Sequence, residues 1–167
     1  MSASLKDITI RNTLEPGDLG FITCLHGSLY GCEYGYGIQF EAYVARGLLE
    51  FYSRYDPSRD RVWICQHGER LVGCLLLMHR EGNSAQLRYF LIHPEYRGIG
   101  LGKHLMQLFM RFLKECRYQS AYLWTTHELS TAASLYKRYG FILTEEKEST
   151  DFGKNVREQR YDLNFIS

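Results

Sequence analysis

A glycine-rich segment has the residue types and spacing of a phosphate-binding loop. The segment consists of Arg97, Gly98, Ile99, Gly100, Leu101, Gly102 and Lys103. Three glycines weaken a helix start, because glycine loses more backbone entropy on folding than other residues. The same glycines let backbone N–H groups converge on phosphate oxygens at the positive end of a helix, where Arg97 and Lys103 add charge. The alternative is a turn that only packs a helix against a strand.

Hydrophobic periodicity predicts the elements that hold this loop. Residues 101–113 repeat apolar side chains at helical spacing, and the run over 85–92 before Pro94 is typical of a strand. Asp18 is expected to cap the first helix. Before this region, the pattern predicts a strand over 5–12, helices over 19–30 and 40–54 joined by a loop over 31–37, and strands over 62–66 and 71–79. After it, the pattern predicts a strand over 120–125, a helix over 129–139, and strands over 141–148 and 157–165. This order indicates a mixed α/β protein in which an antiparallel meander precedes a βαβ unit.

The composition limits the class of protein. The chain, residues 1–167 with 45% hydrophobic residues, is expected to form a single domain. Twenty Lys plus Arg against nineteen Asp plus Glu give no field that indicates nucleic acid or an anionic membrane as a partner. Without a signal-peptide pattern or a membrane-length apolar run, a cytoplasmic location is expected. Five cysteines without CxxC spacing favour free thiols and no metal site.

Two motifs resemble signatures of the GNAT superfamily of N-acetyltransferases. Residues 97–102 match its Arg/Gln-x-x-Gly-x-Gly/Ala signature, and residues 132–141 match the A-x-x-L-Y-x-x-x-G-F segment of its later helix. Beyond this core the chain is similar to acetyltransferase domains fused to MarR-type regulators, although no regulator domain is expected before Leu5. That likeness is carried by His26-Gly27, Tyr30, Glu33-Tyr34-Gly35, Phe40-Glu41, Leu123-Trp124-Thr125 and Gln159-Arg160-Tyr161-Asp162-Leu163.

The resemblance implies a fold and a co-substrate. The implied GNAT fold has a mostly antiparallel sheet of six to seven strands, splayed between the fourth and fifth strands and flanked by about four helices. The implied co-substrate is acetyl-CoA, with its pyrophosphate on the glycine loop and its pantetheine arm on backbone groups of Leu91 and Ile92. The Ile92 N–H would polarise the thioester carbonyl. Leu129 stands where the family often has asparagine, so that contact is lost or passes to Ser130, which is also suited to cap the helix.

The resemblance names one catalytic residue and leaves the proton acceptor open. Tyr136 occupies the position of a tyrosine that protonates the CoA sulfur in relatives that use it, with packing in a buried stripe as the alternative. Glu33 and His26 are the candidates for general base and substrate contact, with capping or surface solvation as the alternative. Tyr30 and Tyr34 are expected to line the acceptor site together with Glu33, unless they are ordinary half-buried packing residues.

Together these features predict an acetyl-CoA-dependent N-acetyltransferase that acetylates a primary amine of a small molecule, an amino acid or a peptide. The alternative is a non-catalytic acyl-CoA-binding regulatory module, because a fold alone does not establish catalysis. A third interpretation is that the glycine loop binds a nucleotide. Relatives of this family often form dimers, so a homodimer is considered.

Overall fold

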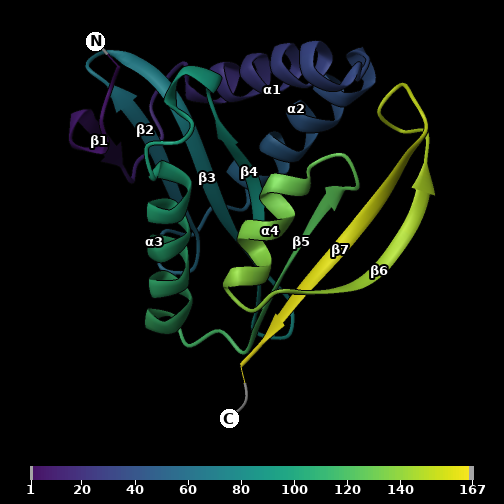
Figure 1. Ribbon diagram of the computed structural model, residues 1–167. Coiled ribbons are helices and arrows are strands. Elements are labelled where there is room, and N and C mark those ends of the chain that lie inside the picture. The colour runs from purple at the N-terminus through teal and green to yellow at the C-terminus, as the bar shows by residue number, and fades with distance from the viewer. Residues whose placement is uncertain (1, 166–167) are drawn as a thin grey trace.

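One mixed sheet of seven strands organises residues 2–165, the part of the chain that the computed structural model describes (Figure 1). The strands lie in the order β1-β2-β3-β4-β5-β7-β6, and neighbours pair antiparallel except β4 and β5, which run parallel. The strands are β1 (Ile8–Arg11), β2 (Arg61–His67), β3 (Arg70–Arg80), β4 (Ser84–Ile92), β5 (Ser120–Thr126), β6 (Ile142–Ser149) and β7 (Val156–Asn164). The predicted mixed and mostly antiparallel sheet is confirmed.

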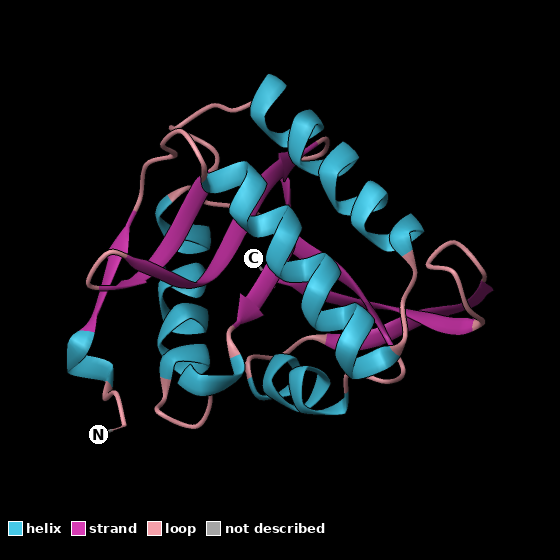
Figure 2. Ribbon diagram, turned by 90° about the horizontal axis from the view of Figure 1, so that it is seen from above, coloured by secondary structure: helices cyan, strands magenta, loops and turns pink. Residues whose placement is uncertain are grey.

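Four α-helices of the described chain cover the two faces of this sheet. They are α1 (Asp18–Tyr34), α2 (Ile38–Ser53), α3 (Leu101–Glu115) and α4 (Ser130–Arg138). Strand β2 separates the two cores, because Val62 and Ile64 pack with α1 and α2 whereas Trp63 and Cys65 pack with α3 and α4. Figure 2 shows the two long helices α1 and α2 running alongside one another over the sheet.

A bulge in β4 coincides with the place where β4 and β5 separate. One residue of β3, Leu75, faces two residues of β4, Tyr89 and Phe90, and Tyr89 has a positive φ of 56°. Such a bulge bends its strand and redirects side chains. Strands β4 and β5 pair only through Ser84–Gln86 and Ser120–Tyr122, so they diverge from Leu87 onward. The predicted splay between the fourth and fifth strands is confirmed.

The structure differs from the sequence-based expectation near the N-terminal helices. Helix α1 continues to Tyr34, so the expected loop over 31–37 is reduced to its last three residues. Gly17 is the N-cap of α1, which makes the expected capping role of Asp18 wrong. Asp18 is instead the first helical residue, and its buried carboxylate accepts a hydrogen bond from Arg11 Nη1 at 2.7 Å. The strand expected over 5–12 is a 3₁₀ turn, Leu5–Asp7, followed by the short β1.

Candidate active site

The glycine loop presents an uncapped helix start to open space. Gly98 and Gly100 have φ angles of +79° and +89°, a conformation that strains residues with a side chain. Gly100 is the N-cap of α3, and no side chain caps this helix within the described chain. A Cβ at either glycine would meet no protein atom within 4 Å. The first N–H groups of α3 are therefore left for an anion, as the phosphate-binding prediction requires.

An outer cleft of about 700 Å³ runs from this loop along β4 and α4. It is lined by all the predicted cofactor-binding residues except one: Leu91, Ile92, Arg97, Gly98, Gly100, Leu101, Gly102, Lys103, Ser130 and Tyr136. The exception is Ile99, which packs against the core on the α3 side of the sheet. Leu129 is the N-cap of α4 and Ser130 its first residue, so the expected capping role of Ser130 is wrong and its side chain borders the cleft.

Ile92 has a free N–H at the splayed edge, whereas its carbonyl is already bonded. The His93 N–H donates to the Val72 carbonyl at 2.8 Å, toward β3. Consecutive residues of a strand direct their N–H groups to opposite sides, so the Ile92 N–H points toward the splay. The Ile92 carbonyl accepts a hydrogen bond from Arg97 Nε at 3.1 Å. Of the two groups expected to meet the pantetheine arm at Ile92, the geometry leaves the N–H.

A smaller inner cavity of about 120 Å³ adjoins the outer cleft on the α1–α2 side of the splay. Both are lined by Tyr30, Phe90, Leu129, Ala132 and Tyr136. The other aromatic residues of the inner cavity are Tyr36, Phe40, Tyr43, Tyr89, Trp124 and Phe152. These rings come from helices, strands, the loop between α1 and α2 and the loop between β6 and β7, and they give the small chamber a mostly aromatic lining. The cleft and the cavity therefore meet at the tip of the splay.

Tyr136 lies at this junction, where its ring has the packing role expected as one of two alternatives. It is a buried residue of α4 whose ring packs against Phe90, Phe141 and Tyr161. Its hydroxyl forms no hydrogen bond with any residue in 2–165. Burial raises the pKa of Tyr136 well above the usual range of a phenol. The side chain is thus a protonated phenol at neutral pH with its donor unused.

His26 lines the inner cavity as a neutral imidazole. Its Nδ1 lies 2.8 Å from the Ile22 carbonyl, which makes Nδ1 the protonated nitrogen. Its ring packs edge-on against Tyr89 and beside Tyr30. Burial lowers the pKa of His26 to about 4, because no nearby carboxylate compensates for the lost solvation of the charged form. The residue is in the expected place, but it is a weak proton acceptor at neutral pH.

Glu33, the other candidate for general base, does not line the inner cavity. Its two carboxylate oxygens accept hydrogen bonds from Arg97 Nη1 and Nη2 at 3.1 and 2.8 Å. This bidentate pair fixes Arg97 beside the glycine loop. Tyr34 lines only the outer cleft, whereas Tyr30 lines both the cleft and the cavity. Of the three residues expected to bind the acceptor, Tyr30 alone borders the inner cavity.

Two charged residues of the inner cavity, Glu158 and Arg88, are not predicted as site residues from the sequence. Glu158 on β7 is 7% exposed, and its carboxylate forms no hydrogen bond within the described residues. Arg88 on β4 has an 11% exposed side chain and also lines the cavity. A charged residue in the apolar run 85–92 was a usable signal for Arg88. Glu158 had no such signal, because its strand alternates many polar residues.

The loop between β6 and β7 closes the inner cavity from the side of α2. The Gly37 N–H donates to the Phe152 carbonyl at 2.9 Å, and the Phe152 ring packs against Tyr36 and Phe40. Lys154 Nζ donates to the Tyr34 carbonyl at 2.7 Å and to Glu128 Oε2 at 3.1 Å. These bonds tie the loop to the end of α1.

Residues 2–165 contain no group of three or more His, Cys, Asp or Glu side chains that could hold a metal ion. None of the helices in this range is both long and apolar enough to cross a membrane.

Curated proteins similar to this chain are described as N-acetyltransferases. The chain is 30% identical over 97 residues to "Uncharacterized N-acetyltransferase YjgM" of Escherichia coli, and the match covers 56% of this chain and 58% of that protein. It is 23% identical over 110 residues to "Probable N-acetyltransferase 14" of Xenopus tropicalis, covering 65% of this chain and 53% of that protein. The chain thus spans a little over half the length of these two relatives.

Solved structures and a family model agree with this likeness. An acetyltransferase of the GNAT family from Staphylococcus aureus superposes with a TM-score of 0.75 at 18% identity, covering 95% of this chain and 99% of that one. A GNAT acetyltransferase from Elizabethkingia anophelis with acetyl-CoA bound superposes with a TM-score of 0.63 at 15% identity and the same coverage. The model of the acetyltransferase (GNAT) family matches residues 28–141, which is more than half of the sequence. The chain therefore belongs to the GNAT acetyltransferase family.

Proposed function

We propose that this protein is an acetyl-CoA-dependent N-acetyltransferase that acetylates a primary amine. In this proposal the outer cleft binds acetyl-CoA and the inner cavity binds the acceptor. The observation that carries it is the continuity of the two spaces at Tyr136, because acyl transfer requires the thioester and the amine to meet at one point. The acetyl-CoA complex of a protein with the same fold supports the choice of donor.

The outer cleft has the donors that acetyl-CoA requires. The uncapped start of α3 offers N–H groups to the pyrophosphate, and Lys103 and Arg138 line the same cleft as cations. At the other end of the cleft, the Ile92 N–H is suited to donate to the thioester carbonyl oxygen as negative charge develops on it.

We assign the proton transfers to Glu158 and Tyr136. The amine nitrogen attacks the carbonyl carbon, so that a C–N bond forms and the C–S bond breaks. Glu158 accepts the proton that the amine loses, and the Tyr136 phenol gives its proton to the departing sulfur. Exchange with water restores both side chains after the products leave. Glu33 is not assigned as the base, because Arg97 holds its carboxylate outside the inner cavity.

The proposal is tested by measuring the free thiol released from acetyl-CoA in the presence of a panel of primary amines. We expect release that depends on both substrates and an acetylated product identified by mass spectrometry. If CoA stabilises the protein against heat and no amine gives release, the protein is a CoA-binding module. If ATP stabilises the protein against heat and CoA does not, the assignment of acetyl-CoA as the acetyl donor fails.

The cytoplasmic location, the single domain over 1–167 and a homodimer remain predictions from the sequence.

A further inference from the structure

Arg88 is a largely buried cation without a hydrogen-bonded partner. Its guanidinium forms no hydrogen bond within residues 2–165, and its nearest carboxylate contact is Glu50 Oε2, 3.7 Å from Nη1. The group stacks on the Tyr89 ring, 4.8 Å from the centroid, which leaves its N–H edge unused. An arginine has five N–H donors, and those of Arg88 stay accessible, because the fully buried side-chain atoms without a partner in residues 2–165 are the Tyr89 hydroxyl and Glu128 Oε1. This side chain is therefore prepared to bind an anion in the inner cavity.

Gly47 on α2 leaves room for the side chains of Arg88 and Tyr89. A Cβ on Gly47 would collide with the Tyr89 hydroxyl and would lie 2.6 Å from Arg88 Nη2. The bulge in β4 turns Tyr89 to the α2 side that Arg88 already faces, and a glycine on the helix accommodates both side chains. The position of Arg88 is thus fixed by packing from two elements.

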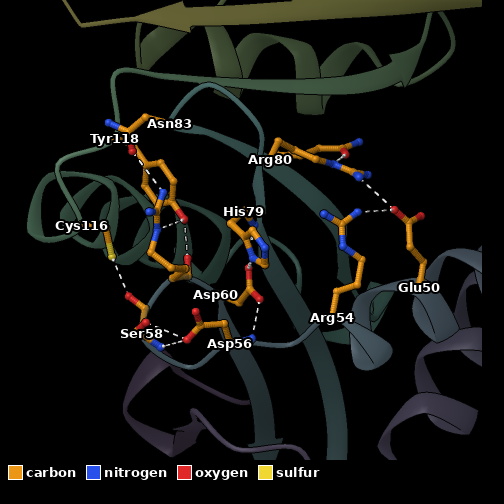
Figure 3. Close-up of polar contacts among 12 residues, drawn as sticks. Glu50, Arg54, Asp56, Ser58, Asp60, His79, Arg80, Asn83, Cys116 and Tyr118 are labelled. Atoms are coloured by element: carbon orange, nitrogen blue, oxygen red, sulfur yellow. Dashed lines mark hydrogen bonds and ion pairs between the residues drawn. The ribbon is translucent and has the colours of Figure 1, made fainter.

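The charge around Arg88 is not balanced by its neighbours. One carboxylate, Glu50, contacts three guanidinium groups: Arg80 at 2.9 Å, and Arg54 and Arg88 at 3.7 Å each. Figure 3 shows the side chains of Arg54, the C-cap of α2, and of Arg80 on β3 both directed toward the Glu50 carboxylate. Only the bond from Arg80 is a hydrogen bond. A second anion would therefore find an excess of positive charge here.

Gln86 adds a second donor beside Arg88. Its Oε1 accepts hydrogen bonds from Arg80 Nε at 2.9 Å and from the Tyr122 hydroxyl at 3.3 Å. These bonds leave the amide NH₂ group without an acceptor among the described residues. Gln86 and Arg88 are two positions apart on β4, so they share one face of the strand, and both line the inner cavity. One edge of the cavity therefore offers only donors.

A hydrogen-bond acceptor lies on β7, where Glu158 presents a carboxylate to the same cavity. Arg88 and Glu158 form no ion pair within 4.0 Å, and neither do Glu158 and Lys147, its direct neighbour on β6. Lys147 instead lies over the Trp124 ring, with Nζ 4.6 Å from the centroid. A cation and an anion are thus held apart in one small aromatic chamber. A ligand with an amine and a carboxylate satisfies both.

We propose that the acceptor is a small aminocarboxylate, such as an amino acid, whose carboxylate binds Arg88 and Gln86 while its amine faces Glu158. This inference rests on the proposed function, because it takes the inner cavity as the acceptor site. A planar carboxylate matches the guanidinium in a bidentate, charge-assisted pair. A diamine or polyamine would leave Arg88 unpaired and place a second cation beside it. The cavity volume of about 120 Å³ favours a small acceptor.

The test compares free amino acids with their carboxamides, which replace the carboxylate with an uncharged group of similar shape, each at the pH at which its amine is equally deprotonated, and includes putrescine as a cationic amine. With wild-type protein and acetyl-CoA, we expect kcat/KM for a free acid to exceed that of its amide at least tenfold. Arg88→Gln is expected to lower kcat/KM for the acid by about 10- to 100-fold, mainly through KM, and to lower kcat/KM for the amide much less. Arg111→Gln, on the exposed side of α3, is the matched control.

Two outcomes overturn the aminocarboxylate proposal. One is an amide or putrescine that is acetylated as well as the best free acid; the other is an Arg88→Gln variant that loses both acceptors equally. Equilibrium dialysis of labelled amino acids with the CoA-bound protein gives a readout without turnover. If thiol is never released yet wild type binds a free acid and Arg88→Gln does not, the catalytic proposal fails and the aminocarboxylate site stands. If no free acid binds or reacts, the site is rejected.

Discussion

The outer cleft and the inner cavity meet at Tyr136 but are built in different ways. The cleft takes much of its lining from one continuous segment, residues 97–103, and offers backbone N–H groups at the start of α3. The cavity takes its lining from α1, α2, β4, β5 and β7, and offers the side chains of Arg88 and Glu158. A backbone site depends on local turn geometry, whereas a side-chain site depends on tertiary packing. Substitutions in the cleft should therefore change donor affinity, and substitutions in the cavity should change turnover or acceptor choice.

The largest expected effect separates the two regions through Glu158. Glu158→Gln keeps the shape of the side chain and removes the proton acceptor, so we expect kcat to fall by about 100- to 1,000-fold. The dissociation constant of acetyl-CoA, measured by calorimetry, should stay within about twofold. Glu148→Gln is the control, because Glu148 lies on the neighbouring strand with a 75% exposed side chain. If Glu33→Gln abolished turnover and Glu158→Gln did not, the assignment of the base would be wrong.

The inner cavity should also make stability depend on pH through His26. Burial lowers the pKa of this residue from about 6.5 to about 4, so the unfolded chain binds a proton that the folded chain does not at pH values between these limits. The free energy of unfolding should therefore fall as the pH drops from 7 to 4, by about 3 kcal/mol from this residue.

The His26 effect is isolated by a variant that cannot titrate. Urea unfolding at pH 7, 5.5 and 4 should show a steeper loss of stability toward low pH for wild type than for His26→Phe, because only the unfolded wild type gains a proton on residue 26. Parallel curves would contradict the pKa assignment. Backbone N–H groups do not titrate, so the start of α3 in the outer cleft has no counterpart to this effect.

The same contrast explains what the sequence predicts well. Helices, strands and the splay follow from hydrophobic periodicity and from the family resemblance, and the boundaries agree within a few residues for most elements. The glycine loop is legible because Gly98 and Gly100 need left-handed backbone conformations wherever the rest of the chain lies. Ten of the eleven predicted cofactor-binding residues line the outer cleft, counted as Leu91, Ile92, Arg97, Gly98, Gly100, Leu101, Gly102, Lys103, Ser130 and Tyr136.

The acceptor site is harder to predict from the sequence, because its chemistry depends on which side chains pair with one another in the folded protein. Glu33 was a reasonable candidate from its place near the end of α1, but an ion pair with Arg97, 64 positions later, directs its carboxylate elsewhere. Glu158 becomes a cavity residue only because β7 lies beside β5 in the sheet. Arg88 lines this cavity only because the face of β4 that carries it is covered by α2, and the bulge after Arg88 turns Tyr89 to the same side. None of these long-range relations is encoded in a local motif.

Tyr136→Phe tests the junction between the two regions. The hydroxyl has no hydrogen-bonded partner within residues 2–165, so its removal should change the free energy of unfolding by less than about 0.5 kcal/mol. We expect kcat to fall by roughly 10- to 100-fold, because the departing sulfur loses its proton donor. Equal kcat values for the two proteins would leave Tyr136 with its packing role alone. Thermal unfolding of both proteins with and without CoA controls for folding.

The smallest expected effect belongs to the glycine loop, through Gly100→Ala. A φ of +89° costs a residue with a Cβ about 1 to 2 kcal/mol, and the methyl group would enter the open space beside the start of α3 without touching a protein atom. We expect the affinity for acetyl-CoA to fall about tenfold, whereas kcat at saturating acetyl-CoA and the preference between acceptors stay near wild type. Isothermal calorimetry with CoA and saturation kinetics with one acceptor measure the two quantities separately. A change in acceptor preference would contradict the division between a backbone-built donor site and a side-chain-built acceptor site, because Gly100 lines only the outer cleft.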